Sequence, residues 1–491
     1  MNRALLRLSL ACLAMFVLLL LNVNYVQAFE AGTLASKAGN ARTFDQQFQY
    51  QRGAIVAGIA GGGVKIAESR LIKGTNEYQR YYPDGPAYAP VTGYDSIYSA
   101  TGIEAAEDKQ LAGTDPRLAV HNLIGLLTGK PKQGATVYLT INPKAQQAAY
   151  QALKASGHPA AAVAIDPSTG AILALASYPT FNPNAYATLD GNRLKRIDNA
   201  YLRDPGQPLL NRATMATFPP GSSFKVVTSS TAFSTGKVAN PQTAVPAPTS
   251  LPLPGSTVSL INDGNEACGN GHPQLIYAFT ISCNTAFGDL GIRLGNPALH
   301  KYATAFGMNS PNLTIPLPVA QSNYPVLTDR AQTALSAIGQ FDDTVTPLQE
   351  AMFAATIANN GTLMKPYLVQ QVQAPDLNPI QTASPAPLSH PVSPQVAGYV
   401  RQMMVQVTNN QAGTAYATAN QNVAGVLIAG KTGTAQNGIN NTNLNDAVFT
   451  CFAPAYSPRI AVGVIVKGGG FGADAAAPIA VKIIQAYLGV K

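Results

Sequence analysis

The segment Pro219-Pro220-Gly221-Ser222-Ser223-Phe224-Lys225 decides how the whole chain is interpreted. Two prolines and a glycine end the preceding structure, and the apolar residues after Lys225 predict a helix that runs to Phe233. A serine at the start of a helix lies near unpaired backbone N–H groups and the positive end of the helix dipole. Because Lys225 follows Ser222 by one helical turn, its amine can reach the serine hydroxyl and take its proton. The segment therefore predicts a serine nucleophile with a lysine base.

A second segment, Ser234-Thr235-Gly236-Lys237, fits the same Ser-x-x-Lys pattern. It falls where the helix should end, since glycine is a typical C-terminal cap. We therefore exclude Ser234 as the nucleophile. An N-capping serine followed by an exposed lysine would also fit the pattern, so Ser222 needs support from other segments.

Two further segments supply that support. Ser282-Cys283-Asn284 carries a hydroxyl and a carboxamide, and Lys431-Thr432-Gly433-Thr434 carries a cation, two hydroxyls and a glycine. Ser310-Pro311-Asn312 also fits Ser-x-Asn, but its central proline indicates a loop. Ser-x-x-Lys, Ser-x-Asn and Lys-Thr-Gly together are the signature of β-lactamases and penicillin-binding proteins. Each motif is weak alone, and their order along one chain is the signal.

With these motifs in place, the chain resembles the class B penicillin-binding proteins, and among them the short members with one N-terminal apolar segment. The resemblance covers nearly all of the chain after that segment, on the following landmarks: Arg52-Gly53, Tyr82-Pro83 to Leu111, Asp166-Pro167-Ser168-Thr169-Gly170, Phe181-Asn182-Pro183-Asn184, Asn211-Arg212-Ala213 and Phe452-Ala453-Pro454. One segment departs from the family, because Asp446 and Val448 stand where many relatives carry His and Trp. This departure puts in doubt a histidine or tryptophan beside the site, not the core chemistry.

The resemblance implies a D,D-transpeptidase that cross-links peptidoglycan stem peptides ending in D-Ala-D-Ala. Ser222 would attack the penultimate D-Ala carbonyl and form an acyl-enzyme, which an amine of a neighbouring peptide then takes over. Lys225 would be the base, with a pKa lowered by burial and by the nearby positive Lys431. Ser282 would pass a proton to the leaving amine. Asn284 would either bind the substrate backbone or orient Lys225.

The Lys-Thr-Gly segment suits a substrate that ends in a free carboxylate. Lys431 supplies a positive charge, and the hydroxyl groups of Thr432 and Thr434 are hydrogen-bond donors. Gly433 allows the substrate to approach the strand closely. The backbone N–H groups of Ser222 and Thr434 would form the oxyanion hole. β-Lactams would be covalent inhibitors because penicillin mimics D-Ala-D-Ala.

Composition and charge limit the other function classes. Of the 491 residues, 46% are hydrophobic and 11% are charged, which is typical of globular domains. The net charge of +8 is spread without a Lys/Arg-rich run, so we expect no nucleic-acid partner. A basic surface would instead favour anionic lipids or cell-wall polymers. No His, Cys and Asp residues have the spacing of metal ligands, and we expect no metal and no cofactor.

The N-terminus predicts membrane attachment. Arg3 and Arg7 precede an apolar run from Leu8 to Leu21, an order that predicts a cytosolic N-terminus and an extracytoplasmic catalytic domain. We expect residues 1–28 to form a single-pass anchor, although the small residues of Val26-Gln27-Ala28 leave a cleaved signal open.

The predicted extracytoplasmic location also bears on the four cysteines of the chain. Cys268 and Cys283 lie close in sequence and are disulfide candidates, since disulfides persist outside the cytosol. Whether they are bridged stays open at this stage. Cys12 lies in the apolar N-terminal segment, and Cys451 is expected to be a buried thiol in a strand.

The predicted elements place strands at both ends of a mainly helical middle. We expect strands at 136–141, 161–165, 171–176, 426–429, 447–453 and 460–466, helices at 143–153, 331–340, 347–359 and 475–488, an irregular stretch at 189–211, and a loop or edge insertion at 375–394. This order predicts an α+β domain with helices packed on an antiparallel sheet. The resemblance implies the five-stranded serine β-lactamase/penicillin-binding transpeptidase fold. We expect three parts: the membrane segment 1–28, a small N-terminal stalk or interaction domain 29–155, and the transpeptidase domain 156–491.

Three alternative functions share the same motifs. A serine β-lactamase would hydrolyse its acyl-enzyme quickly, and a D,D-carboxypeptidase would use water as the acceptor. A non-catalytic β-lactam-binding scaffold would keep the fold, and we would expect it to carry a cytosolic signalling domain. The part before Ala161 shows no acidic pair that suits glycosyl transfer, so the resemblance implies a separate membrane glycan polymerase as a partner. The sequence leaves open the acceptor amine, the β-lactam spectrum, the oligomeric state and a septal or side-wall role.

Overall fold

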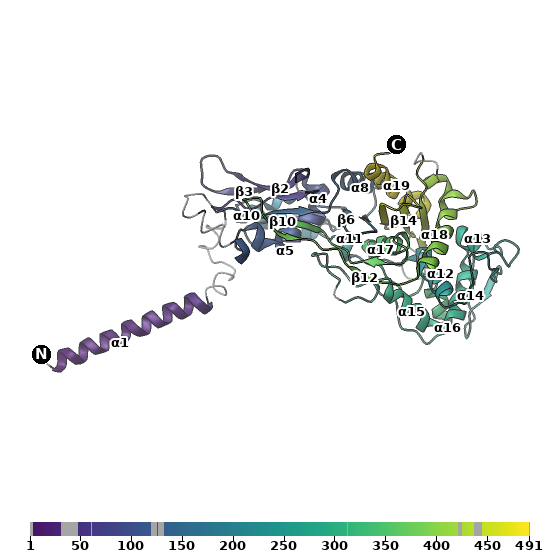
Figure 1. The fold of residues 1–491 in the computed structure, drawn as a ribbon, viewed down its shortest axis with the longest axis horizontal. Helices are drawn as coiled ribbons and strands as arrows, with labels where there is room; N and C mark the ends of the chain where they lie inside the picture. Colours follow the sequence, from purple (N-terminus) through teal and green to yellow (C-terminus); the bar gives the residue numbers. More distant parts are fainter. Residues whose placement is uncertain are drawn as a thin grey trace.

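The structure is a computed structural model that describes residues 3–30, 48–59, 61–118, 125, 132–311, 313–420, 425–436 and 444–490. Figure 1 shows an elongated molecule, with helix α1 (Arg3–Tyr25) at one end and the larger helical and sheet body at the other. Most side chains of α1 are apolar and exposed. The helical segment Leu5–Glu30 is long and apolar enough to cross a membrane.

The larger body is built on a five-stranded antiparallel sheet, as predicted. Its strands are buried along most of their length, and apolar residues, chiefly Ala, Val, Ile and Phe, predominate in three of them. The order across the sheet is β13 (Ala429–Ala435), β14 (Asp446–Ala453), β15 (Ile460–Val466), β5 (Ala160–Ile165) and β6 (Ile172–Tyr178). Strand β13, which carries Lys-Thr-Gly, is therefore an edge strand. The predicted α+β class is confirmed.

Helices cover this sheet. Helix α17 (Pro347–Ala358) is buried at every residue and contacts β5, β14 and β15. It approaches β15 so closely that a Cβ at Gly463 would lie 2.6 Å from the Pro347 carbonyl oxygen. Helices α8 (Pro143–Ser156) and α19 (Ala477–Leu488) pack against each other, α8 also on β6 and α19 also on β15. Although α8 precedes residue 156, it therefore belongs with the larger sheet.

The remaining helices of the larger body carry or support the motifs. They are α12 (Lys225–Ser234), which follows the 3-10 turn η3 (Gly221–Phe224), then α13 (Leu275–Thr280), α14 (Asn284–Leu294), α15 (Asn296–Ala305), α16 (Arg330–Ser336) and α18 (Pro394–Asn409). Helix α12 ends at Ser234, and Gly236 follows with φ of 71°, as expected for a C-terminal cap. Cys268 and Cys283 form a disulfide with their Cα atoms 6.1 Å apart. Cys451 is a buried free thiol and Cys12 is exposed.

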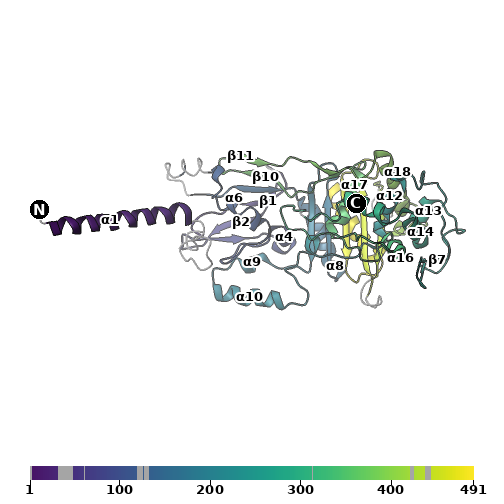
Figure 2. The ribbon, with the colours of Figure 1, turned by 90° about the horizontal axis from the view of Figure 1, so that it is seen from below.

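The N-terminal region holds a six-stranded sheet to which a distant part of the chain contributes. Its order is β11 (Pro379–Thr382), β10 (Val369–Gln373), β4 (Thr136–Leu139), β1 (Ile55–Ala57), β2 (Val64–Leu71) and β3 (Tyr78–Tyr81). Figure 2 shows the green strands β10 and β11 beside the blue strands of the N-terminal region. The chain thus returns from the larger body to complete the smaller sheet.

A buried ionic cluster joins this sheet to helix α5 (Gly102–Ala106). The Glu104 carboxylate accepts hydrogen bonds from Arg52 Nε at 2.8 Å and from Arg80 Nε at 2.6 Å. Tyr82 Oη donates to the same carboxylate at 3.1 Å, and Arg52 Nε lies 3.6 Å from the Asp95 carboxylate. Arg52, one of the family landmarks, is therefore a structural residue.

Two sequence-based expectations are wrong. Residues 189–211, expected to be irregular, contain helix α10 (Gly191–Arg203), capped by the Asp190 carboxylate, which accepts from two backbone N–H groups. Only Leu194 of this helix is buried, so its polar sequence reflects exposure to solvent. The strand expected at 426–429 instead begins at Ala429 and contains the Lys-Thr-Gly motif itself.

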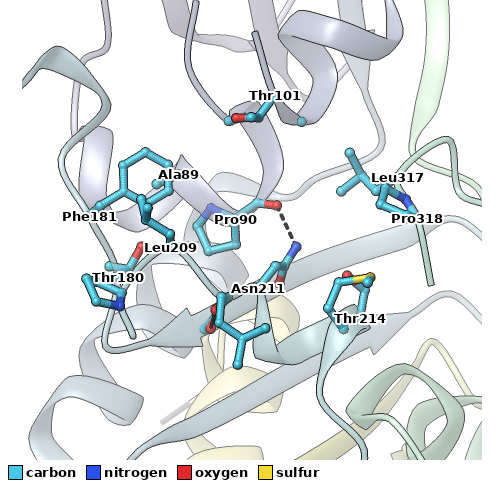
Figure 3. A pocket seen from close by; sticks show the side chains of 16 residues that line it. Ala89, Pro90, Thr101, Thr180, Phe181, Leu209, Asn211, Thr214, Leu317 and Pro318 are labelled. Carbon is cyan, nitrogen blue, oxygen red and sulfur yellow. Dashed lines mark hydrogen bonds between the residues drawn. The ribbon is translucent and has the colours of Figure 1, made fainter. Parts of the chain in front are cut away.

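A small pocket of about 120 Å³ lies where the two regions meet (Figure 3). Helix α4 (Gly85–Thr92) supplies Pro90, whose carbonyl oxygen accepts from Asn211 Nδ2 at 2.9 Å. Phe181, Leu209 and Leu317 line the pocket with apolar surface. No residue of the three motifs lines it, so the chemistry has to be sought elsewhere.

Candidate active site

The three motifs converge on one cleft of about 1190 Å³. Residues from the turn before α12, the α13–α14 junction and the edge strand β13 line it together: Ser222, Ser282, Asn284, Thr432 and Thr434. Segments that are 60 to 150 residues apart in sequence thus meet at one surface. Lys225 and Lys431 lie buried behind this surface, with no exposed side-chain area.

The turn that carries Ser222 is pressed against β13 and the Gly339 loop. Gly221 adopts φ of 55°, which only glycine adopts without strain, and its N–H donates to Gly339 O at 3.0 Å. A Cβ at Gly221 would lie 2.8 Å from the Thr434 carbonyl oxygen. Ser222 therefore sits in a tight 3-10 turn that passes directly into α12 at Lys225.

Lys225 is held by the Ser-x-Asn segment. Its Nζ donates to the Ser282 carbonyl and to Asn284 Oδ1, each at 2.7 Å, and lies 3.3 Å from Ser282 Oγ. The ring of Phe287 lies beneath the amine, 5.4 Å from Nζ. Burial, aided by the positive charge of Lys431, lowers the pKa of Lys225 well below its usual value, against a weaker opposing effect of Asp263.

Ser282 owes its orientation to an unusual backbone conformation. It lies between α13 and α14 with φ of 61°, in the left-handed region that non-glycine residues rarely adopt. This conformation lets both its carbonyl and its hydroxyl reach Lys225. The Cys268–Cys283 disulfide fixes the next residue, and the Thr285 N–H donates to Asn262 Oδ1 at 2.9 Å. Such conformations concentrate at functional sites because the surroundings hold them in place.

Lys431 reaches the same serine from the opposite side. Its Nζ donates to Ser282 Oγ and to the Thr432 carbonyl, each at 2.9 Å. The Phe279 ring lies 5.6 Å from the amine. Burial lowers the pKa of Lys431 to about 7, although Asp263 partly opposes the shift.

The open edge of β13 faces the cleft. The Thr434 carbonyl accepts from Gln340 Nε2 at 2.9 Å on the side away from β14. Because the N–H and C=O of one strand residue point to the same side, the Thr434 N–H also points away from β14. A Cβ at Gly433 would lie 2.6 Å from the Pro220 carbonyl oxygen. Gly433 is therefore required because the turn before Ser222, and not only a substrate, approaches the strand closely at this position.

Sequence reasoning missed two polar residues at the cleft. Gln340 binds both the Thr434 carbonyl and, through Oε1, the Gln436 N–H at 3.3 Å. Thr414 Oγ1 lies 2.6 Å from Thr432 Oγ1, so the two hydroxyls share a hydrogen bond. Neither residue belongs to a motif. The sequence signal nearest to them is Gly339-Gln340 at the end of a predicted helix, and it indicates a helix cap and not a binding residue.

Asp446, where the family pattern is broken, lies at the start of β14. It is buried, and its Oδ1 accepts from the Gly468 N–H at 2.8 Å. Val448 is the partner of Gly433 across β13 and β14, and its Cβ would lie 2.9 Å from a Cβ at Gly433. These positions therefore support β13. Within the part of the chain that the structure describes, no three His, Cys, Asp or Glu side chains lie close enough together to hold a metal ion.

Comparison with known proteins matches both regions. Residues 160–485 match the family described as the penicillin binding protein transpeptidase domain, and residues 52–137 match the penicillin binding protein A dimerisation domain. The chain is 42% identical over 502 aligned residues to the peptidoglycan D,D-transpeptidase PbpA of Mycolicibacterium smegmatis, with 99% of each chain covered.

Solved structures of penicillin-binding protein A from Mycobacterium tuberculosis are similar as well. The ceftriaxone acyl-enzyme complex matches with a TM-score of 0.85 at 40% identity, over 90% of this chain and 99% of that one. The penicillin G acyl-enzyme complex matches with a TM-score of 0.84 at 41% identity, over 89% of this chain and 100% of that one.

Proposed function

Because the chain belongs to the penicillin-binding protein transpeptidase family, we propose that it is a peptidoglycan D,D-transpeptidase acting through an acyl-enzyme on Ser222. The resemblance to class B penicillin-binding proteins is confirmed, and the similarity is to penicillin-binding protein A in particular. The observation that carries the proposal is the contact of both buried amines, Lys225 and Lys431, with Ser282 in the cleft that Ser222 lines.

The contacts of Lys225 favour a neutral amine. Ser282 O and Asn284 Oδ1 are carbonyl oxygens that can only accept, so they take both hydrogens of an uncharged amine. The remaining lone pair is then free to take a proton from a hydroxyl. Burial and the nearby Lys431 lower the pKa of Lys225, which favours the neutral amine. Lys225 is our base for acylation, and Asn284 orients it.

Ser282 links the two amines as a proton relay. Lys431 Nζ donates to Ser282 Oγ and Lys225 Nζ lies 3.3 Å from the same oxygen, so the serine hydroxyl hydrogen remains available for the departing amine. In acylation, Lys225 takes the Ser222 proton while Oγ attacks the penultimate D-Ala carbonyl. The proton then passes through Ser282 to the departing D-Ala amine. An amine of a second stem peptide reverses the sequence and receives the acyl group.

Substrate binding uses the edge of β13. The positive Lys431 and the hydroxyls of Thr432 and Thr434 suit the terminal carboxylate of D-Ala-D-Ala. The Thr434 N–H, which points to the open edge, forms the oxyanion hole with the Ser222 N–H. Each such donor contributes about 3 to 4 kcal/mol to transition-state stabilisation in other enzymes.

The division of the chain is part of the proposal. Residues 1–28 form a single-pass anchor, 29–155 an N-terminal interaction domain and 156–491 the transpeptidase domain on the extracytoplasmic side. Support comes from the apolar α1, from two arginines at its N-terminal end and from separate family matches to the two regions. Helix α8 and strands β10 and β11 cross that division in space. A separate membrane glycan polymerase supplies the strands to be cross-linked.

Labelled penicillin tests the proposal directly. The wild-type protein should gain one penicilloyl group, which peptide mapping by mass spectrometry should locate on Ser222, and Ser222→Ala should gain none. Ser234→Ala, which removes the serine of the second Ser-x-x-Lys segment, is the matched control and should label normally. Labelling of Ser222→Ala would show that another residue is the nucleophile.

The fate of the acyl group separates the related reactions. A transpeptidase should hold the penicilloyl group for many minutes and should pass a stem-peptide acyl group to an added amine. Rapid loss of the adduct with repeated turnover would indicate a β-lactamase. Release of the shortened peptide without transfer to the amine would indicate a D,D-carboxypeptidase.

A further inference from the structure

Glu350 is a buried carboxyl group next to the nucleophile turn that the mechanism above does not use. It lies on α17 with no exposed area, and its Oε1 is 2.7 Å from Ser223 Oγ, in the residue after the nucleophile. Its Oε2 has no hydrogen-bond partner among the described residues. An ionised carboxylate with a single hydrogen-bond partner is costly to bury, which favours a protonated Glu350.

The number of hydrogens available around Ser223 Oγ indicates whether Glu350 is protonated. Ser223 Oγ lies within hydrogen-bond distance of two oxygens, 2.9 Å from the Pro220 carbonyl and 2.7 Å from Glu350 Oε1. The hydroxyl has one hydrogen, and a carbonyl and a carboxylate can only accept. With Glu350 ionised, one of the two contacts has no hydrogen and brings two lone pairs together. With Glu350 protonated, it donates to Ser223 Oγ, Ser223 donates to Pro220 O, and both contacts are hydrogen bonds.

These hydrogen bonds lead from Glu350 to strand β13, the strand proposed to bind the substrate. The Pro220 carbonyl oxygen lies against Gly433 of β13, where a Cβ would come within 2.6 Å of it. At the other end, the Glu350 backbone carbonyl accepts from Thr450 Oγ1 of β14 at 2.6 Å. The carboxyl group is therefore fixed to the sheet and, through Ser223, fixes the distance between the nucleophile turn and the Lys-Thr-Gly strand.

We propose that protonated Glu350 is a positioning residue for Ser222, acting through the hydrogen-bond chain Glu350–Ser223–Pro220. The inference rests on the proposed function, because it gives Glu350 a role in the acylation of Ser222. Ionisation of Glu350 removes one hydrogen from the chain and introduces a negative charge behind the turn. The turn then loses its fixed distance from β13, and acylation slows.

The surroundings of Glu350 are consistent with a group that titrates alone. Burial raises the pKa of Glu350 to about 8. The ionisable side chains on the elements packed against α17 are Arg212 of α11 (Arg212–Met215), Tyr399 and Arg401 of α18, and Asp446 and Cys451 of β14. Lys225 and Lys431 lie beyond the nucleophile turn. None of these groups forms an ion pair with Glu350 in the described residues.

The kinetic test compares the wild type with Glu350→Gln across pH. Glutamine keeps the donor to Ser223 Oγ but cannot ionise, so its penicillin acylation rate at pH 7 should stay within about twofold of the wild type. Above the Glu350 pKa the wild type should slow relative to the variant, by about tenfold at pH 9. Taking the ratio of the two rates cancels the titration of both lysines. A ratio that stays constant from pH 6 to pH 9 would overturn the proposal.

Ser223→Ala breaks the same chain at its centre. Its acylation rate should fall about five- to tenfold at pH 7, as expected for the loss of a buried hydrogen bond. Ser230→Ala is the matched control, since Ser230 Oγ is buried on α12, the helix that follows the turn, and donates to the Val226 carbonyl at 2.8 Å. Equal losses in the two variants would show a general effect of removing a buried hydroxyl and would contradict the role of Ser223.

Infrared spectroscopy detects whether the Glu350 carboxyl is protonated and needs no measurement of activity. At pH 7 the wild type should show a protonated-carboxyl C=O band that is absent from Glu350→Gln and that disappears on titration with a midpoint near pH 8. The difference spectrum is needed because burial also raises the pKa of Asp343. If all wild-type carboxyl bands survive in Glu350→Gln, Glu350 is ionised and the proposal fails, while Ser222 acylation remains independently testable.

Discussion

The N-terminal ionic cluster and the active-site cleft both bury ionisable side chains, but only the cluster pairs them with groups of opposite charge. Around Glu104, two arginines contact one carboxylate directly, with Asp95 nearby. In the cleft, the hydrogen-bond acceptors around Lys225 and Lys431 in the described part of the chain are hydroxyl, carbonyl and carboxamide oxygens. Asp263 is the acidic group that acts on both lysines, and it does so weakly.

The pKa values follow this difference. The two arginines hold the pKa of Glu104 below its usual value despite burial, so the carboxylate stays charged. In the cleft, burial lowers the pKa of Lys225 well below its usual value and that of Lys431 to about 7. A matched cluster stays charged over a wide pH range and supports structure. Unmatched buried amines can exchange protons, which is what a base and a relay require.

Replacing the base should give the largest effect on activity. In Lys225→Arg the side chain cannot lose its proton, so penicillin acylation should fall about a thousandfold although the positive charge remains. Stopped-flow measurement of acylation would check this. Arg80→Lys in the matched cluster is the opposite case, and it should leave the acylation rate unchanged. Near-normal acylation by Lys225→Arg would exclude lysine as the base.

Breaking the matched cluster should give the largest effect on stability. Glu104→Gln removes the carboxylate that Arg52 and Arg80 share and takes from buried Arg80 its ion-pair partner, which should cost about 3 to 5 kcal/mol of unfolding free energy. The folded-state pKa of Glu104 is lowered, so its contribution is present at neutral pH and is lost as the pH falls through that lowered value. Urea unfolding at pH 7 measures the loss. Glu68→Gln, which removes a surface ion pair with Arg70, is the control and should change stability by less than about 1 kcal/mol.

Opening the disulfide should have a smaller effect on stability. The bond between Cys268 and Cys283 closes a loop with a sequence separation of 15, so its loss should cost about 3 kcal/mol by the chain-entropy model. Thermal unfolding of Cys268→Ser/Cys283→Ser against the wild type would measure it. Since Ser282 adjoins the bond, acylation should also slow. A variant with unchanged stability would show that the bond does not constrain the unfolded chain.

The pH profile of acylation should give the smallest effect. Acylation should rise as Lys225 loses its proton and should fall as Lys431 loses its positive charge near pH 7, giving a bell-shaped profile. Lys431→Arg keeps the charge at high pH, so its falling limb should move upward, with a several-fold higher rate at pH 8 relative to its own maximum. A falling limb that stays in place would assign it to another group.

Local sequence determined the elements with strong patterns. The apolar runs predicted strands β5, β14 and β15 within one or two residues, because strands buried on both faces typically read as near-continuous apolar runs. Helix α10 was missed because an exposed helix can be almost wholly polar.

The sequence alone also supplied the chemical groups of the proposed site, since Ser222, Lys225, Ser282 and Lys431 stand in recognisable motifs. Only the tertiary structure brought these motifs to one cleft. The left-handed conformation of Ser282, the open-edge orientation of the Thr434 N–H and the hydrogen count at Ser223 depend on contacts between segments far apart in the chain. Spacing along a chain limits which residues can share a helix face, whereas protonation depends on burial and on the partners that the fold brings into contact.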